Sequence, residues 1–142
     1  MSTVQEIHSR TADTTTTQRR PVWKHGVAAA AAAAVATTVL AAIAKAAGVS
    51  FADSTGASIP VAGFAELTVV FSLIGAGVAA VMARKARHPR TTFVRTAVAL
   101  TVLSYVPDLI SGFSAGSAAT LIALHTVAAV IVVPTLARRL AR

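Results

Sequence analysis

The sequence predicts an all-α fold, an integral membrane bundle of four helices in up-down order with both termini in the cytoplasm. Three observations lead to this prediction. Four apolar runs, each long enough to cross a bilayer, take up most of the 142 residues. Hydrophobic residues make up 55% of the chain and charged residues only 13%, against about 25% charged residues in a typical soluble domain. The basic residues, finally, gather at alternate ends of the apolar runs.

The chain begins with a polar segment, residues 1–21, which contains the run Thr14–Thr17 and shows no hydrophobic period. A segment of this composition cannot bury enough apolar surface to fold. We therefore expect a disordered N-terminal tail, followed by a transmembrane domain over residues 22–142.

The transmembrane domain contains four predicted spans. At 1.5 Å per residue, about 20 residues cross the ~30 Å hydrocarbon core of a bilayer. The spans cover residues 24–46, 61–83, 92–111 and 117–137. Because the connections between them are short, consecutive helices are expected to be antiparallel neighbours.

The first span owes its apolarity mainly to Ala28–Ala34 and could instead be a secretory signal. Residues 18–24, QRRPVWK, resemble a twin-arginine signal, and Ala42–Ala44 offers a small-x-small cleavage site. Twin-arginine cargo is normally a folded soluble domain, whereas three more spans follow here. A retained helix is therefore favoured, with cleavage as the alternative.

Twelve of the 13 basic residues lie on one side of the predicted bundle, in the tail, in the turn between the second and third spans, and at the C-terminus. Only Lys45 lies on the other side. The positive-inside rule then places the chain in a bacterial cytoplasmic (inner) membrane, with both termini inside. The basic residues flank apolar spans and do not alternate with stacking aromatics. This argues against nucleic acid as a partner and in favour of anionic lipid headgroups.

Four ionisable residues lie towards the outer side, each on a different span: Lys45, Glu66, Asp108 and His125. An ionisable residue inside a membrane is costly to insert and often functional. The four residues are therefore the candidate polar pocket. Its two carboxylates could hold a proton or a cation, and His125 could titrate near neutral pH.

A purely structural interpretation of the same residues stays open. Lys45 and Glu66 could extend their side chains to the headgroups, while Asp108 could end its helix and His125 could bond to a neighbouring helix. Tyr105, one turn before Asp108, could join a polar network, but an interfacial aromatic is favoured.

No cofactor, metal or catalytic residue is predicted. The chain has no cysteine, and the four histidines lack the depth and spacing that a haem or zinc site requires. The small residues of the second span are expected to act in helix packing, with Gly75 paired to Ala79 and Ala76 paired to Ala80. Pro107 and Pro134 are expected to kink or end their helices.

Several short motifs resemble those of a known group of proteins. They are Val22–Lys24, Ala47–Phe51, Ser104–Asp108 and Leu124–Val127. Together they resemble an uncharacterised family of small four-helix membrane proteins from high-GC, actinobacterial-type bacteria, a domain of unknown function. The resemblance covers about residues 22–140. It implies a four-helix inner-membrane protein and implies no activity.

The function expected from these observations is that of a structural or accessory membrane bundle without enzymatic activity. Its partner would be a second copy of the chain or another membrane protein. The alternative is a small proton- or cation-coupled transporter that uses Glu66, Asp108 and His125. A membrane enzyme acting on lipid or quinone, with His125 as its base, is the least favoured of the three.

Overall fold

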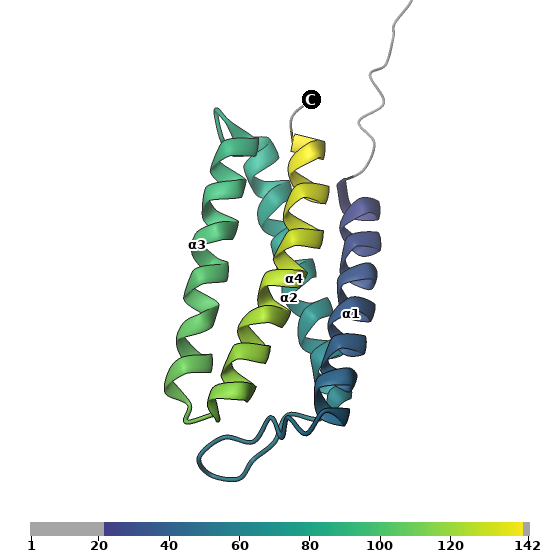
Figure 1. Ribbon diagram of the computed structural model, residues 1–142. Coiled ribbons are helices and arrows are strands. Elements are labelled where there is room, and N and C mark those ends of the chain that lie inside the picture. Colours follow the sequence, from purple (N-terminus) through teal and green to yellow (C-terminus); the bar gives the residue numbers. More distant parts are fainter. Residues whose placement is uncertain (1–21, 141–142) are drawn as a thin grey trace, which may run out of the picture.

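The computed structural model describes residues 22–140, which form four helices: α1 (Val22–Ala46), α2 (Val61–Lys85), α3 (Pro89–Ile110) and α4 (Ala115–Leu140). All four are long and apolar enough to cross a membrane. They run up and down in sequence as one bundle (Figure 1). The predicted four-helix membrane bundle is thus confirmed. The predicted disordered tail, residues 1–21, lies outside the described residues.

The two ends of the bundle differ in composition. The start of α1, the turn between α2 and α3, and the end of α4 lie together (Figure 1). This end, which we call the basic end, carries all the described basic residues except Lys45. The opposite end, called the loop end, holds the connection 47–60 and the turn 111–114 between α3 and α4.

Local sequence explains where the third and fourth helices begin. Pro89 occupies the first turn of α3, a position at which its missing N–H costs nothing. Ser114 precedes α4, and its hydroxyl accepts a hydrogen bond from the Ser117 backbone N–H at 3.2 Å, as an N-cap does. Both helices therefore begin two or three residues before the predicted spans.

The two prolines inside helices do not end them. The helix α3 continues past Pro107 to Ile110, and α4 continues past Pro134 to Leu140. Of the two expected effects of these prolines, a kink or a helix end, the helix end does not occur. Each ring removes only one helical hydrogen bond, and neighbouring helices in a membrane bundle can support such a gap.

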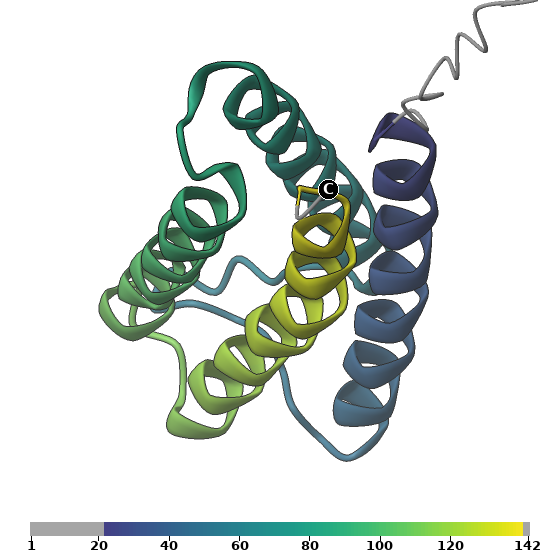
Figure 2. The same cartoon turned by 90° about the horizontal axis from the view of Figure 1, so that it is seen from above.

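The helices pack with α1 and α3 on opposite sides and out of contact, while α2 and α4 touch each other and both outer helices (Figure 2). The helices α1 and α2 approach each other closely at Gly26 and Ala76. A Cβ atom at Gly26 would lie 2.8 Å from the Cβ of Ala76, so this crossing requires glycine. Nearby, buried alanines, Phe93 and Leu136 form the core of the basic half.

The helix α3 is the least enclosed of the four. Only 11% of its apolar window is buried inside the bundle, against 33% for α1. Large apolar side chains such as Val98, Leu103 and Leu109 are exposed along it. In a bilayer these side chains meet lipid or another protein.

The connection at the loop end folds back against the bundle. Phe51 is fully buried there and its ring packs on Phe64, with ring centroids 4.9 Å apart. The Ser54 backbone N–H donates to the Ser111 carbonyl at 3.5 Å. A Cβ atom at Gly112 would lie 2.7 Å from the Cβ of Ser54. The connection therefore covers the α3–α4 turn and closes the loop end.

Asp53 organises the tip of this connection. Its Oδ1 accepts hydrogen bonds from the Thr55 hydroxyl at 2.7 Å, the Thr55 N–H at 2.8 Å and the Ala57 N–H at 3.1 Å. These bonds, the one from the Thr55 hydroxyl above all, hold the pKa of Asp53 below its ordinary value. The ionised carboxylate thus favours the closed turn.

Candidate functional site

Of the four residues of the predicted polar pocket, the structure brings together two, Asp108 and His125. The imidazole Nδ1 of His125 lies 3.0 Å from Oδ2 of Asp108. Asp108 stands near the end of α3 and is buried, whereas the His125 side chain, in the first half of α4, is 42% exposed. The pair bridges the two helices on the surface of the bundle.

The same Nδ1 atom has a second oxygen neighbour, the carbonyl of Leu121, at 3.0 Å. A carbonyl can only accept a hydrogen bond, so the proton of the ring resides on Nδ1 in this arrangement. The bond geometry favours Leu121, and Oδ2 of Asp108 has no hydrogen-bond partner within the described residues. Asp108 and His125 therefore lie side by side, with Nδ1 bonded to the Leu121 carbonyl and the second ring nitrogen, Nε2, free of hydrogen bonds within residues 24–140.

A second polar contact joins the same two helices. The hydroxyls of Tyr105 and Thr126 lie 2.8 Å apart. Thr126 donates its own proton to the Ile122 carbonyl at 2.8 Å, so Tyr105 is the donor to Thr126. The Tyr105 ring meets His125 edge-on, with centroids 6.4 Å apart.

We call this surface the α3–α4 polar face: Tyr105, Asp108, His125 and Thr126. From the sequence, an interfacial position was favoured for Tyr105 over a polar network, and Thr126 was not predicted to take part, whereas the two hydroxyls are in contact. A usable signal existed, because Tyr105 and Asp108 are three residues apart and so share one side of a helix. His125 and Thr126 are adjacent polar residues on α4, the neighbouring helix, so they were the residues to pair with Asp108 and Tyr105.

Glu66 and Lys45 do not join this face. Both side chains are exposed, and neither forms a hydrogen bond or an ion pair with any residue between 24 and 140. The polar contact on the other side of the bundle is instead made by hydroxyls: Thr37 and Thr68 lie 3.0 Å apart across α1 and α2. The predicted pocket of four residues is in the structure a pair.

The residues predicted to act in helix packing have different surroundings. Ala79 is fully buried in the core of the basic half, and Ala76 faces Gly26. Apart from its chain neighbours and its own helix backbone, no described atom lies within 4 Å of the place where a Cβ of Gly75 would be. Ala80 is half-buried. Within the described part of the chain, no three side chains of the metal-binding types come together.

Comparison with known proteins gives one match. Searches among curated proteins and among solved structures found none. Residues 17–142, which include all four helices, match DUF6069, described as a family of unknown function. The chain therefore belongs to this family.

Proposed function

We propose that this protein is an accessory bundle of a bacterial cytoplasmic membrane, without catalytic activity, that binds another membrane-embedded chain through the α3–α4 polar face. The observation that carries the proposal is the exposed imidazole of His125. A polar ring on the outside of a membrane bundle needs a partner that lipid does not supply.

The depth of His125 makes this need strong. The residue stands ten positions after the start of α4, so it lies about 15 Å along a helix of about 39 Å. This position is well inside the hydrocarbon core, where an unsatisfied polar group costs several kcal/mol. A hydrogen bond from a neighbouring chain to Nε2 would remove that cost.

The surroundings of the polar face favour a protein partner. The helix α3 is the least enclosed helix, and its apolar side chains are exposed beside Tyr105 and Asp108. Polar side chains that hydrogen-bond between helices and close apolar packing are the forces that join helices in a membrane. The face offers both.

The basic end is proposed to lie in the cytoplasm. Lys24, the α2–α3 turn and the last turn of α4 bring the basic residues to that end. Basic residues are retained on the cytoplasmic side of bacterial membranes. A reporter fused after Arg142 should therefore be active only in the cytoplasm, and an active periplasmic reporter would reverse the assignment.

A cross-linking experiment tests the partner directly. The chain has no cysteine, so one cysteine carrying a cross-linker can be placed at Val130, one turn after Thr126 on the same side of α4. Phe71 on α2 is the matched control, because both side chains are 66% exposed. In native membranes the Val130→Cys protein should give a discrete adduct that the Phe71→Cys protein does not.

The adduct should also depend on His125. A hydrogen bond between helices contributes about 1–2 kcal/mol in model peptides, so His125→Leu should weaken the association about five- to thirtyfold. The adduct mass distinguishes a second copy of the chain from another protein. Identical products from both cysteine positions, or an adduct whose yield is unchanged in His125→Leu, would refute the proposal.

A second candidate function is proton- or cation-coupled transport, which the Asp108–His125 pair favours. A carboxylate beside an imidazole in the membrane is a combination found in proton pathways. In vesicles with a pH-sensitive dye, a carrier should show proton flux that Asp108→Asn abolishes and Glu66→Gln retains. Flux equal to that of empty vesicles in the unmodified protein would exclude this function.

A further inference from the structure

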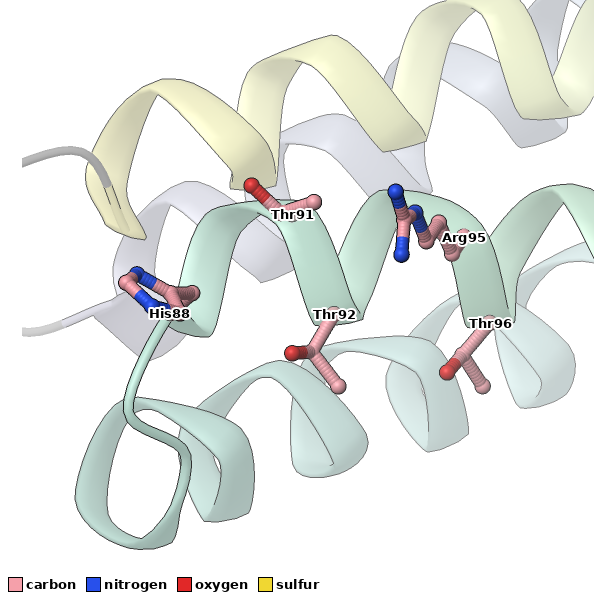
Figure 3. Close-up of a pocket in the computed structure, with 5 residues that line it drawn as sticks. All are labelled: His88, Thr91, Thr92, Arg95 and Thr96. Carbon is pink, nitrogen blue, oxygen red and sulfur yellow. The ribbon is translucent and has the colours of Figure 1, made fainter.

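The basic end carries a cleft on the outer side of α3. The cleft has a volume of about 440 Å³. Its lining consists of five polar side chains: His88, Thr91, Thr92, Arg95 and Thr96. These positions follow the spacing of one helix face, and Figure 3 shows all five along α3. A polar strip of this kind stands out on a helix that is otherwise apolar.

Arg95 stands deeper than the other charges of this end. It follows Pro89 by six residues, which places its Cα about 9 Å further into the membrane. Helical side chains lean towards the N-terminus, and the guanidinium in Figure 3 is directed back towards Thr91. The cation therefore lies over the cleft at the boundary between the apolar core and the headgroups.

The positive charge of this region is not neutralised within the structure. The acidic residues among the described ones are Asp53, Glu66 and Asp108. All three lie in the half of the bundle nearer the loop end, and Arg95 forms no ion pair with any residue from 24 to 140. The cleft thus offers donors and positive charge, which are the features that bind an anion.

The hydroxyls of the cleft are also available. Elsewhere in the helices, Thr101, Thr120 and Thr135 each donate to the carbonyl four residues earlier. Thr96 forms no such bond in the described structure, although the carbonyl of Thr92 is one turn away within the same helix. Its hydroxyl can therefore serve a bound group.

The side of α3 that carries the cleft continues as apolar surface. Val98 and Val102 follow Arg95 by three and seven residues, which keeps them on the same side of the helix, and both side chains are exposed. Polar side chains near the basic end, Arg95 among them, are thus followed along α3 by exposed apolar side chains towards the membrane centre. Such a sequence matches a lipid, whose charged headgroup continues into an acyl chain, and not a soluble anion.

We propose that this cleft binds an anionic phospholipid, with Arg95 as the main ligand of the phosphate. The planar guanidinium can donate two parallel hydrogen bonds to a phosphate. The Thr91 and Thr96 hydroxyls donate to its remaining oxygens, and the acyl chain lies along Val98. The site is independent of the α3–α4 polar face, which lies towards the other end of α3.

The test measures lipid retention by the full chain in nanodiscs or mild detergent, with phosphatidylglycerol and phosphatidylcholine as the two probes. The unmodified protein should retain phosphatidylglycerol in preference. Arg95→Gln should lower its affinity about tenfold or more, because hydrogen bonds to charged groups are the strong ones. Arg84→Gln, an exposed arginine at the same end, removes equal charge and should lower it at most about fivefold.

Further arms separate the alternatives. Arg95→Lys keeps the positive charge and loses the two parallel hydrogen-bond donors of the guanidinium. Its affinity for phosphatidylglycerol should therefore lie between those of the unmodified protein and Arg95→Gln. If Arg95→Gln does not fold, Thr96→Val serves as the second variant, and it should also lower the affinity for phosphatidylglycerol, by a smaller factor. Equal losses in Arg95→Gln and Arg84→Gln would show general surface charge only and overturn the proposal. Displacement of the lipid by an equal concentration of inorganic phosphate would also overturn it, in favour of a soluble anion.

Discussion

The buried ring of Phe51 allows two opposing effects to be separated by two substitutions at one position. Phe51 is fully buried at the loop end and adopts a φ of 53°, in the left-handed region that glycine adopts freely and other residues adopt only at a cost. Removing a buried phenylalanine ring costs about 3–5 kcal/mol. The left-handed conformation costs an L-residue about 1–2 kcal/mol, and this cost is present in Phe51→Ala as in the natural chain.

Glycine removes that conformational cost. Its greater freedom in the open chain takes back about 0.5–1 kcal/mol. Although glycine is the smaller residue, Phe51→Gly should therefore be more stable than Phe51→Ala, by about 0.5–1 kcal/mol. A comparison that considered only buried area would predict the opposite order.

Hydrogen exchange at two backbone amides measures this difference. The Asp53 N–H donates to Ala57 at 2.9 Å, and the Ile59 N–H donates to Phe51 at 3.2 Å, so both amides report opening of the connection. Both variants should exchange much faster than the natural chain. The protection factors of Phe51→Gly should exceed those of Phe51→Ala about two- to fivefold. Equal protection in the two variants, or greater protection in Phe51→Ala, would refute the assigned conformation, and unchanged protection in both would refute the anchoring role of the ring.

Two further predictions concern helix packing and pH. Gly26→Ala should lower the free energy of unfolding by about 1–3 kcal/mol, because its Cβ would collide with Ala76. The control substitution Gly75→Ala should leave the free energy of unfolding unchanged or raise it. Equal effects of the two substitutions on the midpoint of SDS-induced unfolding would contradict this prediction. The pKa of Asp53 is lowered in the folded state. The ionised carboxylate therefore stabilises the connection fully at a pH above its unfolded pKa of about 3.9. This stabilisation is lost as the pH falls through the lower pKa of the folded state. Protection of the Thr55 amide against hydrogen exchange should therefore fall in strong acid. Asp53→Asn keeps an oxygen acceptor and should remove most of this pH dependence. A pH profile unchanged by the substitution would exclude Asp53 as the source of the dependence.

The number and order of the helices could be predicted from sequence because both depend on one-dimensional features. Apolar runs set the spans, and Pro89 and Ser114 mark two helix starts. The rotation of each helix about its axis could not be predicted in the same way. A helix that is apolar all round has no polar face to orient it, which explains why Glu66 was grouped with Asp108 and His125 although it does not meet them.

The packing contacts show a related limit. The motif at Gly75 looks like a contact between small residues, yet the close crossing uses Gly26. In a chain so rich in alanine, small residues recur at every helical spacing, so the pattern itself cannot select the pair that touches. Asp108 and His125 could be grouped correctly because the short turn 111–114 makes α3 and α4 neighbours.

The division of tasks among the helices follows from where the buried residues lie. The helices α1 and α4 supply most of the buried residues, whereas α2 contributes three and α3 only two, Phe93 and Asp108. A helix that adds little to the core and still carries polar groups is expected to act mainly through contacts outside the bundle. Arg95 and Asp108 stand 13 residues apart on it, or about 20 Å, one suited to a lipid headgroup and the other to a neighbouring chain. Substitutions on the exposed side of α3 should therefore change what the bundle binds far more than whether it folds.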